Sequence, residues 1–202
     1  PETVISRQAS MPVNNLVFVA LMFTVLLGTL FQLVTAALQQ KKISVGEPYF
    51  NTMALPLGLL MLFLMGVGPM LPWGKADPKV LRQQFFIPGA IGLATMPPVL
   101  LWRYSWWEPF TGVEKTFGAF LSQFRGGDWM AMVTFGVGSF VTVVTLREMF
   151  LPAQQRMAES KESFFTAFVS SASRARRRFG GYVVHLGIVA IVVAVAASSA
   201  YK

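Results

Sequence analysis

Histidine is the residue of this chain best suited to chemistry, and it occurs once, at position 185. A single histidine excludes any multi-histidine metal site built from this chain alone. The chain has no cysteine, which excludes a disulfide, a thiolate metal site and covalent attachment of haem. Because neutral imidazole is a good axial ligand for iron, His185 is the first candidate for a metal-binding side chain.

The residues around His185 read RRRFGGYVVHLG over 176–187. On a helix, His185 lies about 10 Å along the axis from Arg178. Gly181 is one turn before it and Gly187 lies just beyond it, so this part of the helix surface has little side-chain bulk. Two interpretations stay open from the residues alone: an axial ligand to the iron of a flat macrocycle, or a structural histidine hydrogen-bonded to a neighbouring helix.

The elements that must position this histidine are those of a polytopic membrane protein. Hydrophobic residues make up 54% of the 202 residues and charged residues only 13%, about half the charged fraction of soluble domains. The net charge of +8 favours anionic lipid headgroups as the partner and disfavours nucleic acid. We therefore expect an all-α transmembrane bundle with about five spanning helices.

Five uncharged segments meet the length of about 17–25 residues that a spanning helix needs. They cover residues 16–38, 52–73, 85–102, 129–146 and 182–201. Apart from His185 they hold no charged or histidine side chain, which disfavours a proton relay, a transporter or a channel. The Gly66-Val67-Gly68 and Gly136-Val137-Gly138 runs indicate close helix contacts, because phosphate loops need a strand, a turn and a helix.

Basic residues predict the orientation of these spans. The link between the second and third spans and the long link before the fifth are rich in lysine and arginine, which places both on the cytoplasmic side. The amino end is then cytoplasmic and the carboxyl end outside, although Lys41 and Lys42 fall on an outer link. Trp102, Tyr104, Trp106 and Trp107 indicate an aromatic belt at the outer interface.

The long cytoplasmic linker, residues 150–178, has apolar side chains at roughly helical spacing. They are Met157, Phe164, Phe165, Phe168 and Val169. This pattern predicts one amphipathic helix that either lies in the membrane interface or packs against the bundle as a connector.

Two blocks of sequence carry a resemblance to a known family. The first contains TVLLGTLF at 24–31 and KISVGEPYFN at 42–51, and the second is RRFGGYVVHLG at 177–187. In this order they resemble the CcmF family of membrane haem lyases, which act in cytochrome c maturation. The resemblance extends over nearly the whole chain.

The resemblance implies a function in the bacterial cytoplasmic (inner) membrane. CcmF-like proteins receive haem from the haem chaperone CcmE and, with CcmH-type partners, ligate it to apocytochrome c. They hold a haem b between two histidines, and His185 matches one of these axial ligands by its place in the His-Leu-Gly block.

The family's tryptophan-rich haem segment and its other haem b ligand have no counterpart in this sequence. Trp106-Trp107-Glu108 does not match that segment. We therefore expect the carboxyl-terminal part of a CcmF-like protein, either a split subunit or a piece of a longer chain, that is incomplete as an enzyme without the remaining part. The alternative is a non-catalytic CcmF-like structural subunit of a larger membrane complex.

Overall fold

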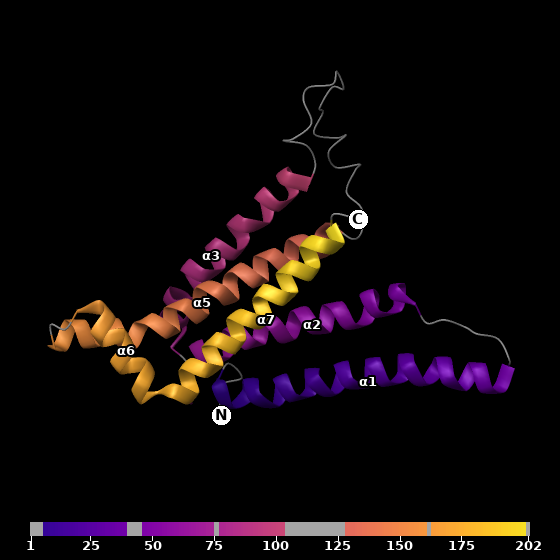
Figure 1. Ribbon diagram of the computed structural model, residues 1–202, viewed down its shortest axis with the longest axis horizontal. Helices are drawn as coiled ribbons and strands as arrows, with labels where there is room; N and C mark the ends of the chain where they lie inside the picture. Colours follow the sequence, from indigo (N-terminus) through magenta and orange to yellow (C-terminus); the bar gives the residue numbers. More distant parts are fainter. Residues whose placement is uncertain (1–5, 40–45, 75–76, 104–127, 161–162, 201–202) are drawn as a thin grey trace, which may run out of the picture. The chain divides into compact units, whose positions relative to one another are not determined.

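The computed structural model describes residues 6–39, 46–74, 77–103, 128–160 and 163–200, and every regular element in this part of the chain is an α-helix. Figure 1 shows these helices. They are α1 (Arg7–Gln39), α2 (Glu47–Met70), α3 (Pro78–Arg103), α5 (Asp128–Ser160), α6 (Phe164–Arg174) and α7 (Arg176–Ala200). The all-α fold expected from the sequence is confirmed.

Four of the described helices are long and apolar enough to cross a membrane. These segments are Arg7–Leu38, Pro48–Met70, Trp129–Ser160 and Arg176–Ser198. The third predicted span, 85–102, lies within α3, whose described residues do not meet the same test. The first turns of α3 carry Lys79, Arg82 and two glutamines, and the side chains of residues 100–103 lie outside the described part. Insertion of α3 into a bilayer stays a prediction.

Two helices run well beyond the spans expected from hydropathy. α1 begins at Arg7, where the Ala9 N–H donates to the Ser6 hydroxyl oxygen at 3.2 Å and Ser6 acts as the N-cap. α5 continues past Leu146 to Ser160. Of the predicted linker, residues 150–160 belong to α5, residues 164–174 form α6 and residues 176–178 begin α7.

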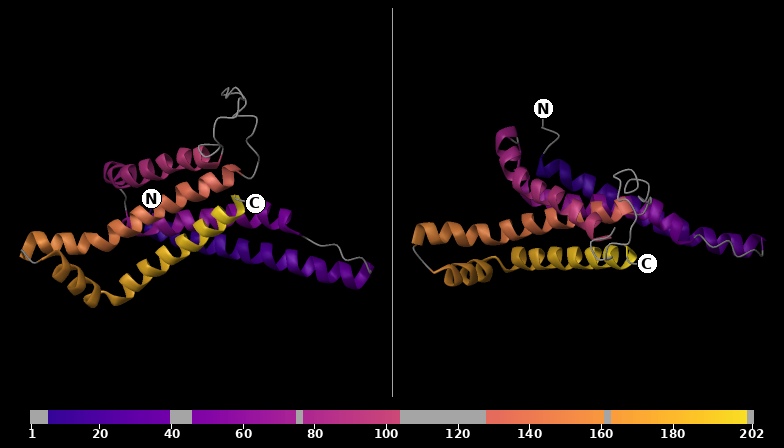
Figure 2. Two further views of the ribbon diagram at one scale, coloured as in Figure 1. Left: turned by 45° about the horizontal axis from the view of Figure 1, so that its top comes forward. Right: turned by 90° about the horizontal axis from the view of Figure 1, so that it is seen from above.

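The described residues form two compact units, Pro1–Pro78 and Lys79–Lys202. In the first unit, α1 and α2 lie side by side (Figures 1 and 2). The Arg7 guanidinium binds the last turn of α2, donating from Nε to the Gly68 carbonyl at 3.2 Å and from Nη2 to the Pro69 carbonyl. Pro72 has no N–H for the Gly68 carbonyl, which accepts instead from the Leu71 N–H at 3.3 Å and from Arg7.

Gly28 of α1 lies against aromatic side chains of the first turn of α2. A Cβ at Gly28 would lie 2.8 Å from Tyr49 Cε1 and 3.1 Å from Phe50 Cζ. The Tyr49 hydroxyl donates to the Thr24 carbonyl at 3.2 Å, one turn before Gly28. The first block that resembles the CcmF family therefore has a structural basis in aromatic packing against a glycine.

The second unit is built around α5, with α7 packed along it. At the α5–α7 contact, a Cβ at Gly138 would lie 2.9 Å from Val193 Cγ2. At the α3–α5 contact, a Cβ at Gly92 would lie 2.8 Å from the Gly136 carbonyl oxygen. The prediction that the Gly136–Gly138 run makes close helix contacts is confirmed. The same prediction is not met at Gly68, which has open space beside its Cα.

Candidate functional site

His185 lies in the third turn of α7, near the edge of the face that packs on α5. Tyr182 and Val189 on the packed face are buried, while Val183, Val184 and Ile188 are exposed. The imidazole is half-buried between these two faces. The packing of α7 on α5 determines this position. Val189 is one turn after His185, and a Cβ at Gly138 of α5 would lie 3.6 Å from Val189 Cγ1.

The two ring nitrogens of His185 differ in their surroundings. Nδ1 is buried and has no hydrogen-bond partner among the described residues. Buried side-chain nitrogens in proteins nearly always have a partner, so an unpartnered one points to a group that the described chain does not contain. The structure therefore gives no interhelical hydrogen bond from His185 within the described part, although the structural-histidine interpretation required one.

The helix surface beside His185 is open, as the glycine-rich sequence predicts. A Cβ at Gly180, Gly181 or Gly187 would meet nothing within 4 Å. Gly181 is one turn before His185 and therefore lies on the same side of the helix. The open surface fits either a flat ligand or a closely packed helix from outside the described residues.

A network of polar side chains fixes the base of α7 against α5, on the side of the helix that carries His185. Arg178 donates from Nε to the Tyr182 hydroxyl and from Nη2 to Glu148 Oε2 at 3.0 Å. The Arg178 guanidinium carbon lies 5.7 Å from the centroid of the Tyr182 ring. The Arg178 side chain is 57% exposed, so this ion pair stabilises the fold by less than about 1 kcal/mol and acts mainly through its geometry.

Aromatic rings next to this network join α6 to α5 and to α7. Phe168 lies 5.5 Å from Phe150 of α5 and 5.6 Å from Phe179 of α7, measured between ring centroids. Phe164 lies 5.9 Å from Phe150, and Phe179 lies 6.1 Å from Tyr182. The sequence pattern placed Phe164, Phe165, Phe168 and Val169 on one apolar face, but the structure separates them. Phe168 packs inward and Phe164 contacts Phe150 with 45% of its surface exposed, whereas Phe165 and Val169 are exposed without a described ring contact.

The donor set of the described chain fits one coordination position of a haem iron and no more. No group of three or more His, Cys, Asp or Glu side chains in the described part is arranged to hold a metal ion. One imidazole can supply one ligand to a haem iron, and its other ring N–H then needs an acceptor, which the buried Nδ1 does not have among the described residues. A second axial ligand would come from outside the described residues.

Sequence reasoning found His185 but missed the residues that position it. Arg178, Glu148 and Tyr182 come together only when α5 and α7 pack, and the spacing of Arg178 and Tyr182 by four residues was the one signal available. The aromatic-belt prediction falls outside the description: Tyr104, Trp106 and Trp107 are not among the described residues, and the Trp102 side chain is not described. Residues 42–45 of the first family block also lie outside it.

Comparison with known proteins identifies relatives along almost the entire chain. It is 29% identical to the cytochrome c-type biogenesis protein CycK of Rhizobium meliloti over 201 residues, which cover 98% of this chain. It is 44% identical to the cytochrome c-type biogenesis protein CcmF of Escherichia coli over 82 residues, 41% of this chain. The chain is a homologue of the CcmF and CycK proteins.

The homology covers a part of these relatives. The aligned residues make up 26% of the Rhizobium meliloti CycK and 13% of the Escherichia coli CcmF. A match of similar extent, 29% identical over 197 residues, exists to the CcmF of Haemophilus influenzae, of which it covers 26%. No family model and no solved structure matches the chain. The resemblance expected from the two sequence blocks is confirmed, and the chain spans about a quarter of these long relatives.

Proposed function

We propose that this chain is a membrane component of a cytochrome c haem lyase and that it binds haem b through His185. The homology to CcmF and CycK along almost the whole chain is the observation that carries the proposal. The open helix surface beside the lone histidine supports the haem site. The lyase receives haem from a CcmE-type chaperone and, with a CcmH-type partner, ligates it to apocytochrome c.

In this proposal the chain's own residues bind and position. His185 would hold the haem iron, and the remaining part of the CcmF-like protein would supply a second ligand. The pair of Arg178 with Glu148 and the contact of Gly138 with Val193 hold α7 on α5, which fixes where the imidazole points. Bound there, haem b supplies a one-electron redox centre that can reduce the haem to be attached.

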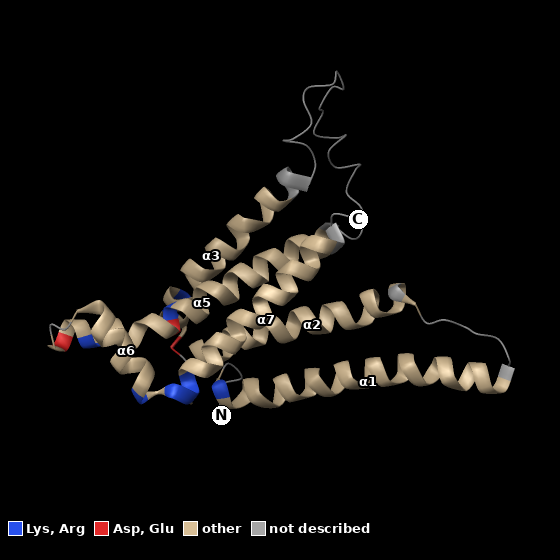
Figure 3. Cartoon of the chain, in the orientation of Figure 1, with Lys and Arg blue, Asp and Glu red and all other residues tan. Residues whose placement is uncertain are grey.

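Charge placement supports the proposed orientation in the bacterial cytoplasmic membrane. In the second unit the described arginines of α5, α6 and α7 gather at one end, where α5 ends and α7 begins (Figure 3). Arg147 of α5 donates to the Gln84 carbonyl at 3.1 Å, which brings the basic start of α3 to the same end. An end of this kind faces the cytoplasm, so the carboxyl end of α7 lies outside.

A non-catalytic structural subunit is the second candidate function. It is favoured by the single histidine and by the open glycine surface of α7, which fits a neighbouring helix as well as a macrocycle. In that case His185 hydrogen-bonds a residue of the neighbour and binds no iron.

Cytochrome c maturation in cells tests the proposed function. His185→Ala is expected to lower the yield of holocytochrome c at least about tenfold. Removing a residue that hydrogen-bonds a metal ligand already lowers metal affinity or activity by about 10–100-fold, and removing the ligand itself should lower it at least as much. Val184→Ala is the matched control, since Val184 is the preceding residue and 59% exposed. Wild-type yield from the His185→Ala chain at equal membrane abundance would exclude the haem ligand.

A further inference from the structure

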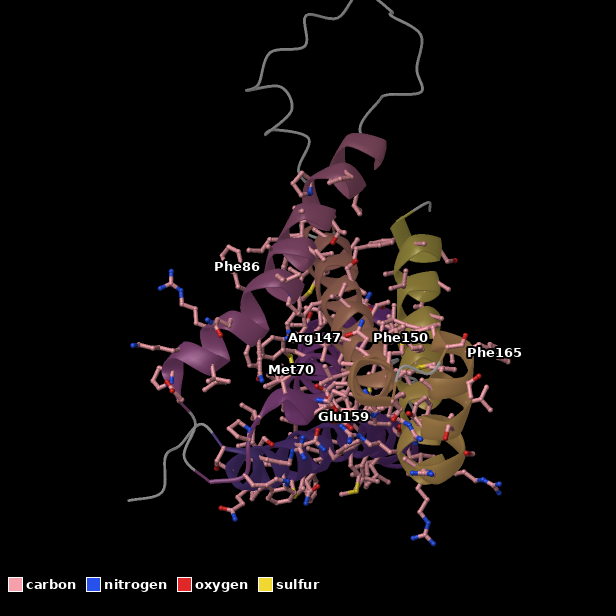
Figure 4. All side chains as sticks on the ribbon, turned by 90° about the vertical axis from the view of Figure 1, so that its left-hand side faces the viewer. Met70, Phe86, Arg147, Phe150, Glu159 and Phe165 are labelled. Carbon is pink, nitrogen blue, oxygen red and sulfur yellow. The ribbon has the colours of Figure 1, made fainter. Side chains whose placement is uncertain are left out.

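α6 has one packed face and one face that no described residue covers. On the packed face Ala167 is fully buried, and Phe168 lies between Phe150 and Phe179. On the other side Phe165 is 74% exposed and Val169, one turn later, is 48% exposed. Figure 4 shows Phe165 on the outer side of α6, away from Phe150. The packing of α6 therefore leaves an apolar pair without a partner in the described chain.

Basic side chains follow this apolar pair directly. Arg174 ends α6, and Arg176 and Arg177 begin α7; all three are exposed and have no described carboxylate partner. The next arginine, Arg178, is the one that pairs with Glu148. α6 itself contains no acidic residue. The exposed side chains of α6 and of the first turn of α7 thus combine apolar surface with positive charge that no described carboxylate pairs.

The placement of α6 matches the surface of a bilayer. It connects the end of α5 to the start of α7, and its ribbon runs across these two helices instead of continuing either one (Figure 1). Both neighbours contain a segment that is long and apolar enough to cross a membrane. A short amphipathic helix at the common end of two spans lies at the depth of the lipid headgroups.

We propose that α6 and the first turn of α7 dock onto anionic phospholipid headgroups of the cytoplasmic leaflet through five exposed side chains: Phe165, Val169, Arg174, Arg176 and Arg177. Charge complementarity selects this occupant, because phosphate-bearing headgroups neutralise the three free guanidinium groups while the two apolar side chains enter the acyl boundary. The sequence predicted only that this linker lies in the interface or packs on the bundle; the exposed side chains now specify its contact residues and the class of lipid that they bind. It does not depend on haem binding by His185.

The absence of cysteine makes a direct test practicable. A single nitroxide label at Val169→Cys in the full chain is compared with one at Gln155→Cys, an exposed position near the end of α5. Each is reconstituted in nanodiscs of phosphatidylcholine alone or with phosphatidylglycerol. With phosphatidylglycerol, the Val169 label is expected to become accessible to oxygen and protected from a water-soluble nickel chelate, while the Gln155 label stays aqueous.

Two further measurements identify the source of any protection. Replacing Arg174, Arg176 and Arg177 by Gln, or raising the salt concentration on the unsubstituted background, should remove the phosphatidylglycerol dependence, since the attraction is screened by salt. Each arginine is expected to change the partition of the label about fivefold. An aqueous Val169 label in both lipids would overturn the proposal. So would protection that is equal in both lipids and insensitive to salt, because it would indicate a protein occupant.

Discussion

At the scale of single residues, two side-chain environments determine what this chain can do. His185 is held at the edge of the α5–α7 contact with Nδ1 buried and unpartnered in the described part. Tyr49 packs against Gly28 and donates to the Thr24 carbonyl, which joins α1 to α2. His185 needs a hydrogen-bond partner from outside the described residues, whereas Tyr49 finds its partners within the α1–α2 unit.

The contact at Gly28 predicts a specific sensitivity to side-chain volume. Gly28→Leu is expected to destabilise the α1–α2 pair by about 1–3 kcal/mol, because the new side chain would overlap Tyr49 and Phe50. Gly58→Leu is the matched control, since Gly58 is in α2 with nothing within 4 Å. The measurement is the fraction of each variant that stays monodisperse after heating in detergent. Equal losses at both glycines would contradict the packing described for Gly28.

The sequence predicted the residue types of these environments but only part of their geometry. A lone histidine in an uncharged segment can be found by inspection, and so can the glycines beside it. The burial of its Nδ1 cannot, because it depends on how α7 rotates against α5. Likewise, the run from Lys42 to Asn51 had no local explanation, since Tyr49 and Phe50 find their partner, Gly28, about 20 residues earlier in the chain.

At the scale of elements, hydropathy located membrane segments better than it located helix ends. The fourth predicted span ends at residue 146 because Arg147 and Glu148 follow, but α5 continues to Ser160. Residues 147–160 include Arg, Glu, Met, Leu, Ala and Gln, which are strong helix formers, so the helix persists after its apolar stretch ends. Charged residues such as Arg147 and Glu148 indicate where the apolar stretch of a helix ends, but they do not end the helix itself.

The α3–α5 contact predicts a loss similar to that at Gly28 from a much smaller substitution, because the opposing atom belongs to the backbone. Gly92→Ala would place Cβ 2.8 Å from the Gly136 carbonyl oxygen and 3.2 Å from Phe140 Cβ, neither of which can rotate away. We expect a loss of about 1–3 kcal/mol from a single added methyl group. Gly89→Ala, with nothing within 4 Å, should be neutral or slightly stabilising. The same heating assay checks both variants, and a tolerant Gly92 would show that α3 and α5 are further apart.

At the scale of the whole molecule, the chain is an all-helical membrane protein that is homologous to about a quarter of the CcmF and CycK proteins. Its described part contains one histidine and a basic end, and the function proposed above requires a second ligand and haem-delivering partners from outside the described residues. The composition already predicted the membrane class. The function required the resemblance, because a single histidine beside glycines is compatible with unrelated functions.

The orientation of the chain across the membrane gives a further prediction. Introduced cysteines are unique in this chain, so a membrane-impermeant maleimide applied to intact spheroplasts reports the side of each one. Asn51→Cys at the start of α2 should react from outside, whereas Gln155→Cys near the end of α5 should react only after the membrane is opened. The reverse pattern would invert the orientation inferred from the arginines.

The central claim is that His185 ligates haem b, and a reduced-minus-oxidised absorption spectrum of the natively purified assembly tests it most directly. The wild-type and Val184→Ala assemblies should show a b-type signal, and His185→Ala should lower bound haem b at least about tenfold. Equal haem b content in the His185→Ala assembly would contradict the claim, and absence of haem from the wild-type assembly would favour the structural subunit.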